Sequence, residues 1–170
     1  MLKEIKKKLA IIEKEQEYLE YLLEHYKNVQ LAWEEIKPKV EKIFSKYNID
    51  AFALDEEIGN HDASKLSYYE FNAYRKNYYP VDFDETFFTG DHHNYEHAFD
   101  CHLMNNRHHW QTVVVGDKRY DYVLHMIVDW EAMGKKFPDN AKQYYENNID
   151  EIKLPDWAVK FMYEVFGLIY

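Results

Sequence analysis

The sequence has one cysteine, four prolines and five glycines among 170 residues. A lone cysteine, Cys101, cannot form an intramolecular disulfide, and it fits a reducing compartment. No apolar run approaches the roughly 18 residues that are needed to span a bilayer. Lysines precede an apolar patch in "MLKEIKKKLAIIEKE", but acidic residues follow at once and no small-residue cleavage site appears. We therefore expect a cytoplasmic protein without a signal peptide or a membrane partner.

Basic residues are also scarce, since 21 Lys and Arg face 31 Asp and Glu and give a net charge of -10. Non-specific binding of nucleic acid depends on neutralising phosphates with Lys and Arg, so we expect none here. Aromatic residues are abundant, and the 16 Tyr and 10 Phe predict a strongly aromatic core. The length suits one domain better than two, and we predict a single domain over residues 1–170.

Helical periodicity dominates the sequence and predicts an all-α fold. Pro38 is expected to break the first long helix or to begin the next one. Ser67 and Glu70 have the spacing of a capping box, and Gly134 is the expected C-cap of its helix. The strand-like run "TVVVGDKRY" leaves room for one short β-hairpin. The expected helices cover residues 18–36, 38–47, 53–62, 68–79, 93–110, 120–133, 139–148 and 155–170.

Nine histidines are many for a chain of this size, and those beside carboxylates are candidate metal ligands. The stretch "NHDASKLS" places His61 next to Asp62 at the junction of two predicted helices, with Lys65 three residues further on. His25 borders the buried face of the first long helix. A hydrogen-bonded histidine at the edge of the core is the alternative interpretation of His25.

Asp129 stands in "LHMIVDWEAMG", a mostly apolar helical segment. Burying its carboxylate requires a partner, and a cation is the simplest one. His125 lies one helical turn before Asp129 on the same face. We interpret it as a hydrogen-bonded core histidine that could also orient a ligand.

The segment "HAFDCHLMNNRHHWQ" holds four further histidines, His97, His102, His108 and His109. His102 and His109 are two helical turns apart and would share one face, whereas His108 would be rotated by roughly 100°. If the helix relaxes near Asn105 and Asn106, His108 and His109 could both face one cavity. A solvent-exposed histidine pair is the alternative.

The order of these candidates resembles the ligand order of the HD-domain superfamily of metal-dependent phosphohydrolases. That order is His25, His61-Asp62, His102, His108-His109 and Asp129, and it covers about 105 residues. More narrowly, "HDASKLSYYEF", "HLMNNRHHWQ" and "VDWEAMG" resemble blocks of an uncharacterised group of small HD-like proteins from phages and bacteria. The resemblance implies an HD-like helical bundle that hydrolyses a small phosphorylated substrate, nucleotides included, in a bacterium or in the host of a phage.

The resemblance also assigns roles to residues. The ligands of one metal ion would be His25, His61, Asp62 and Asp129. The extra histidines of two-metal members would be His102, His108 and His109, with Asp62 bridging both ions. Asp62 and Lys65 would be catalytic, with Lys65 holding a substrate phosphate unless it forms only a surface ion pair. The implied cofactor is one or two divalent transition metal ions, with Mn, Fe, Co, Ni and Zn as candidates.

Arg107, beside the histidine pair, is a second candidate for binding phosphate, because its planar guanidinium can hold two oxygens at once. A solvent-facing arginine is the alternative. The chain lacks the GYP motif of the cyclic-dinucleotide phosphodiesterases.

Three other functions stay open. The same ligand order occurs in HD-type di-iron oxygenases that resemble inositol oxygenase. The run "HNYEH" fits H-x-x-E-H, in which His93 and His97 would bind zinc and Glu96 would act as a base, although no third ligand is evident downstream. A non-catalytic helical binding protein would use the metal only to hold its helices together.

Overall fold

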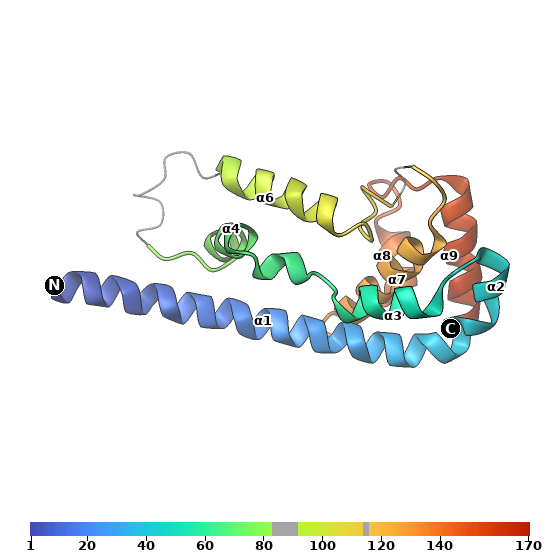
Figure 1. Ribbon diagram of the computed structural model, residues 1–170, viewed down its shortest axis with the longest axis horizontal. Helices are drawn as coiled ribbons and strands as arrows, with labels where there is room; N and C mark the ends of the chain where they lie inside the picture. Colours follow the sequence, from blue (N-terminus) through green and yellow to red (C-terminus); the bar gives the residue numbers. More distant parts are fainter. Residues whose placement is uncertain (83–91, 114–115) are drawn as a thin grey trace. The chain divides into compact units, whose positions relative to one another are not determined.

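The computed structural model describes residues 1–82, 92–113 and 116–170, except for the side chains of residues 92–94. Most of this part is helical and none of it is a strand, which confirms the all-α fold (Figure 1). The elements are α1 (Leu2–Val40), η1 (Glu41–Ile43), α2 (Phe44–Tyr47), α3 (Ala51–Gly59), η2 (Ala63–Leu66), α4 (Tyr68–Tyr78), α6 (His92–Asn105), α7 (Tyr120–Gly134), α8 (Ala141–Asn147) and α9 (Asp156–Ile169).

The described residues form two compact units, and each is assembled from distant segments of the chain. The first unit comprises residues 1–24 and 62–105, and the second comprises residues 25–61 and 106–170. Helix α1 contributes to both, because the boundary falls within it. The prediction of one domain over the whole chain stays a prediction.

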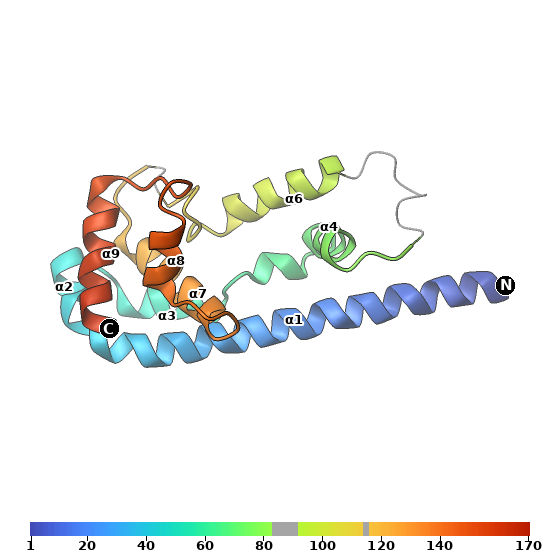
Figure 2. The same cartoon turned by 180° about the vertical axis from the view of Figure 1, so that it is seen from behind.

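In the first unit, α4 packs against α6 and both contact η2. Figures 1 and 2 show α4 and α6 side by side from opposite directions. The small core of this unit is aromatic: Tyr18 of α1 is 1% exposed, and its ring lies 5.1 Å from that of Phe71. Tyr74 and Ala98 complete the contact between α4 and α6.

In the second unit, α7 packs against α3, α8 and α9. Six consecutive residues of α7, from Val123 to Val128, are buried, so this helix is enclosed on all sides of its middle turns. Helix α9 adds Phe161, Met162 and Val165 to the same core. The aromatic core that the composition predicts is therefore present in both units.

Several expectations about helix ends are wrong. Helix α1 begins at Leu2 and not at residue 18, and α3 ends at Gly59, so His61 and Asp62 follow that helix. Pro38 does not break α1, because it falls in the last turn and the helix ends two residues later at Val40. Helix α6 ends at Asn105 instead of reaching Trp110. Gly134 is the last residue of α7, but the cap that follows, Lys135, is right-handed rather than left-handed. Glycine is needed at position 134 for another reason, since a Cβ there would lie 2.3 Å from the carbonyl oxygen of Asp139.

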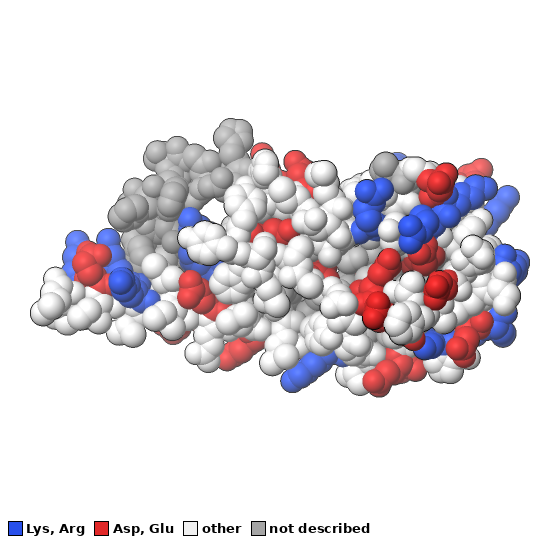
Figure 3. Space-filling model, in the orientation of Figure 1, with Lys and Arg blue, Asp and Glu red and all other residues white. Residues whose placement is uncertain are grey.

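The expected β-hairpin is not formed in the described part of residues 112–120. Thr112 and Val113 lie in turns and Gly116 and Asp117 in a bend, while residues 114–115 lie outside the described part. The expected loop at residues 80–91 also lies largely outside it. Among the described helices, none has the length and apolar character needed to cross a bilayer. Acidic and basic side chains are interspersed on the face of the second unit seen in Figure 3.

Candidate metal centre

Three side chains, from α1, from the turn after α3 and from α7, converge in the second unit. His25 Nε2 lies 3.0 Å from His61 Nε2 and 3.2 Å from Asp129 Oδ1. His61 Nε2 lies 3.5 Å from the same carboxylate oxygen, which closes a triangle of three potential ligand atoms. The two imidazoles are buried and the Asp129 side chain is 15% exposed. The structure therefore brings together three of the four residues predicted to bind the first metal ion.

The edges of this triangle match the spacing of atoms around a metal ion. With metal–ligand bonds of about 2.1 Å, neighbouring ligand atoms are about 3.0 Å apart in an octahedron and about 3.4 Å apart in a tetrahedron. The three observed separations of 3.0, 3.2 and 3.5 Å lie within or near this range. The residues are thus positioned to hold a metal ion.

The carboxylate of Asp129 supports the same conclusion. Its Oδ1 atom is buried and has no hydrogen-bond partner of acceptable geometry, although two imidazoles lie near it. Burial alone would raise the pKa of Asp129, but the rings of His61 and His25 lower that pKa well below its usual range. The rings lower this pKa by the positive charge that they carry when protonated; when they are neutral, as metal ligands are, a bound cation would supply that charge instead.

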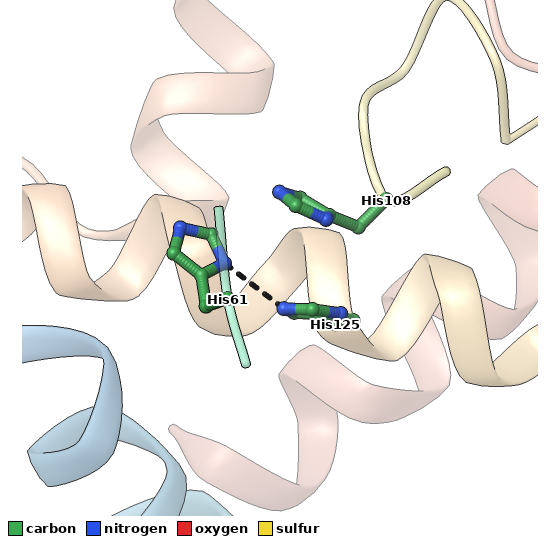
Figure 4. A group of neighbouring side chains, drawn as sticks. All are labelled: His61, His108 and His125. Carbon is green, nitrogen blue, oxygen red and sulfur yellow. Dashed lines mark hydrogen bonds between the residues drawn. The ribbon is translucent and has the colours of Figure 1, made fainter. Parts of the chain in front are cut away.

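His61 is also held from its other side. Its Nδ1 lies 3.0 Å from His125 Nε2, as Figure 4 shows. The ring of His108 stacks on that of His125, with 4.1 Å between the ring centroids. The centroids of the His108 and His61 rings are 4.6 Å apart. All three histidines are buried, and each offers a ring nitrogen within 4.8 Å of the others.

This contact is compatible with His61 as a ligand through Nε2. A neutral imidazole that binds a cation through Nε2 carries its proton on Nδ1, and here that proton would be donated to His125 Nε2. His125 is thus placed to orient a ligand, the second of the two roles that its spacing from Asp129 suggests. Alternatively, His61, His108 and His125 could themselves hold an ion.

The prediction that a helix continues through His108 and His109 is wrong. Helix α6 ends at Asn105, so these two histidines do not have helical spacing. His108 is buried beside His125, whereas His109 is half-buried with its ring 4.3 Å from that of His108. Arg107 is exposed. The expectation that His102 and His109 share a helical face is therefore not met.

The first unit holds the other predicted residues. Asp62 has φ 55°, a left-handed conformation that aspartate adopts more readily than most residues, and its side chain is buried. Lys65 Nζ donates a hydrogen bond of 2.6 Å to Asp62 Oδ2. The other carboxylate oxygen, Asp62 Oδ1, lies 3.2 Å from His102 Nε2. Lys65 therefore forms an ion pair with the HD aspartate, and its side chain is 14% exposed.

Glu70 belongs to this group, and the sequence analysis missed it. Ser67 caps α4 by accepting a hydrogen bond from the Glu70 backbone, but the Glu70 carboxylate does not complete a capping box. Instead it is 2% exposed and accepts a hydrogen bond of 2.7 Å from Ser64 Oγ, while His102 Nδ1 lies 3.1 Å from the same oxygen. The S-x-x-E spacing was explained by the cap alone, although the neighbouring HD motif could have drawn attention to it.

The H-x-x-E-H hypothesis gains no support. The side chain of His93 lies outside the described part of the structure. Glu96 and His97 are exposed, and His97 Nδ1 lies 3.0 Å from the hydroxyl of Tyr69.

A protein-family model described as "Family of unknown function (DUF5662)" matches residues 14–165. The chain belongs to the DUF5662 family. The match includes every predicted site residue of this DUF5662 chain, from His25 to Asp129, and it leaves only the ends outside. No curated protein and no solved structure matches the chain. The resemblance to HD-domain proteins therefore stays a prediction, based on the order of the ligands.

Proposed function

We propose that this protein is a metal-dependent phosphohydrolase that acts on a small phosphorylated substrate, with nucleotides as the first class to test. The observation that carries the proposal is the triangle of His25 Nε2, His61 Nε2 and Asp129 Oδ1, with separations of 3.0 to 3.5 Å. The order of ligands along the chain, which resembles that of the HD phosphohydrolases, supplies the reaction class.

The donor set suits a catalytic ion. His25, His61 and Asp129 would hold it, and Asp62, the next residue after His61, is the fourth ligand that the resemblance implies. Imidazole and carboxylate together suit manganese, iron, cobalt, nickel and zinc, and four protein ligands leave two positions open in an octahedral site. When bound, such an ion would make water a stronger acid and offset the negative charge that develops on the phosphate.

The protein's own groups would position the substrate. Lys65 would exchange its contact with Asp62 for a phosphate oxygen, since the ammonium group is already held beside a predicted ligand by the 2.6 Å hydrogen bond. Arg107 is exposed, so its guanidinium can bind two phosphate oxygens without first breaking a buried contact. His125, through its contact with His61 Nδ1, would keep His61 in the tautomer that leaves Nε2 available.

The test is a panel of phosphomonoesters and nucleotides, offered to the purified protein with manganese, cobalt or nickel. We expect turnover that depends on the metal and is lost in Asp62→Ala and Asp129→Ala, while Asp156→Ala on the surface of α9 leaves it unchanged. Lys65→Ala should mainly raise KM. Absence of turnover with every metal, or full turnover in Asp62→Ala, would refute the proposal.

The same preparation separates the alternatives. Oxygen uptake by the ferrous protein in the presence of a polyol or a phosphonate would indicate an HD-type oxygenase. A melting temperature that falls on chelation, without turnover of any substrate, would indicate a binding protein in which the metal is structural.

A further inference from the structure

The first turns of α1 carry a stripe of exposed apolar side chains in the first unit. Starting at Leu2, these residues recur at alternating intervals of three and four positions. They are Leu2 (69% exposed), Ile5 (49%), Leu9 (59%), Ile12 (57%), Leu19 (46%) and Leu23 (52%), and the exposed Gln16 fills the one polar position in the series. We call these seven residues the α1 seam.

The spacing of the α1 seam is that of positions a and d in a heptad repeat, which forms the contact between helices in a coiled coil. It is separate from the face by which α1 packs in its own unit, where Tyr18 is 1% exposed. The helix thus has one buried face and, in addition, an apolar seam that the described part of the chain leaves exposed. Single exposed leucines are ordinary, but a continuous row of this length marks an interaction surface.

We propose that the α1 seam binds the α1 seam of a second copy of the chain in an antiparallel coiled coil. The charges that flank the seam favour this partner. Lys6 and Lys8 flank its first turns, and Glu13 and Glu15 flank the following ones, at the e and g positions of the repeat. Basic residues therefore come first and acidic residues second, a pattern that is complementary to itself when one helix is reversed.

The register follows from the heptads. In an antiparallel pair, a positions of one helix meet d positions of the other, so Leu9 packs against Ile12 of the second copy at the centre. The same register places Lys6 opposite Glu13 and Lys8 opposite Glu15 of the second copy, with both pairs repeated by symmetry.

A parallel pair in register is less favourable. It would place Lys8 opposite Glu13, which is attractive, but it would also place Glu15 opposite Glu20, which is repulsive. In the antiparallel pair each of these flanking contacts is attractive. Charge thus favours the antiparallel orientation.

The seam is also preorganised. Residues 2–19 are the start of a 39-residue helix whose later turns are held by the core, so association does not have to create helical structure. Only about two and a half heptads overlap, and Gln16 occupies one layer opposite Ile5. We therefore expect a reversible dimer whose population depends on protein concentration.

Sedimentation velocity of the full-length protein over a wide range of concentration tests the association. We expect a monomer–dimer equilibrium in the wild type and a monomer in the double variant Leu9→Asp, Ile12→Asp. The control is Phe52→Asp, which changes an even more exposed apolar side chain at the start of α3 and should dimerise like the wild type. Circular dichroism checks that each variant stays folded.

Charge reversal tests the orientation. Glu15→Lys would bring two ammonium groups together in the antiparallel pair, because position 15 lies opposite Lys8 of the second copy, and it should weaken the dimer roughly tenfold. Adding Lys8→Glu would restore the complementary pairs and the dimer. In a parallel pair the lysine introduced by Glu15→Lys would instead face Glu20 and strengthen association.

A wild type that stays monomeric at all concentrations would overturn the proposal, and so would a dimer that Glu15→Lys strengthens or that the seam variant retains. Binding of a monomeric wild type to anionic vesicles would overturn it as well, since the seam would then serve a lipid surface. None of these results depends on metal binding or catalysis.

Discussion

His25 Nε2 and His61 Nε2 lie 3.0 Å apart, although 36 positions separate the two residues in the chain. Two neutral imidazoles can satisfy this distance with one hydrogen bond, but the buried Asp129 oxygen 3.2 Å from His25 is then left without a partner. A cation in contact with all three atoms removes that conflict, because each atom offers a lone pair.

Asp129→Asn should abolish tight binding of a divalent metal. The amide keeps the size of the side chain but removes the charge, so affinity should fall by more than the roughly 10- to 100-fold that is typical of outer-shell changes. Isothermal titration with cobalt or manganese measures the effect. Asp156→Asn, an exposed change on α9, is the control. Equal affinity in both variants would remove Asp129 from the site.

Glu70→Ala should release His102 from its present orientation. We expect His102 to carry its proton on Nδ1, donated to Glu70, so that Nε2 faces the Asp62 carboxylate. In Glu70→Ala, ¹⁵N NMR of the ring should show a mixture of tautomers, and the affinity of any ion bound by His102 should fall about 10- to 100-fold. Glu70→Gln keeps a hydrogen-bond acceptor, so it should largely restore the single tautomer of His102 and the metal affinity. Glu96→Ala changes an exposed residue and should alter neither the tautomer nor the affinity. This role would be contradicted if the ring of His102 is an imidazolium in the wild type and stays one when metal is added.

Gly134→Ala should destabilise the second unit. The new methyl group would lie 2.3 Å from the carbonyl oxygen of Asp139, and relieving that clash should cost about 1–3 kcal/mol, more than alanine gains as a helix former. Gly167→Ala is the matched control, because nothing lies within 4 Å of its position in α9. Chemical denaturation should show a lower free energy of unfolding for Gly134→Ala and a free energy of unfolding about 0.5–1 kcal/mol higher for Gly167→Ala. If both variants are more stable than the wild type, the loop at Asp139 moves to accommodate the new methyl group.

Asp55 should make the stability of the second unit depend on pH. Burial raises the pKa of Asp55, but hydrogen bonds from Lys37 and Trp33 lower it further, so the net shift is downward. A lowered pKa stabilises the fold above the usual pKa of aspartate, about 3.9, and this stabilisation disappears as pH falls through the lowered value. Asp55→Asn should therefore lower the melting temperature at neutral pH, and the difference from the wild type should vanish in acid. A difference that stays constant with pH would mean that the charge of Asp55 is not involved.

The helices were predictable from the sequence because their apolar residues recur with the helical period, and α7 and α9 lie close to the expected ranges. The errors arose at helix ends and at the expected hairpin over residues 112–120. Pro38 falls too near the end of α1 to break it, and nothing in the local pattern shows that Asp139 approaches Gly134 closely enough to exclude a side chain. Such approaches depend on packing between elements, which periodicity does not contain.

For the candidate site, the order of the ligands led to His25, His61 and Asp129, which the structure brings together. Glu70 was missed because one local explanation, the helix cap, already accounted for its position. The contact of His125 with His61 depends on how the turn after α3 packs against α7, so the sequence could only suggest it. The α1 seam was not recognised because the first helix was expected to begin at residue 18, whereas α1 begins at Leu2.

The most direct test of the account is anomalous X-ray diffraction from crystals grown with cobalt or manganese. The account predicts a peak about 2.0–2.2 Å from His25 Nε2, His61 Nε2 and Asp129 Oδ1 together. Crystals that contain the metal but show no anomalous density at these three atoms, with the histidines hydrogen-bonded to each other, would contradict it.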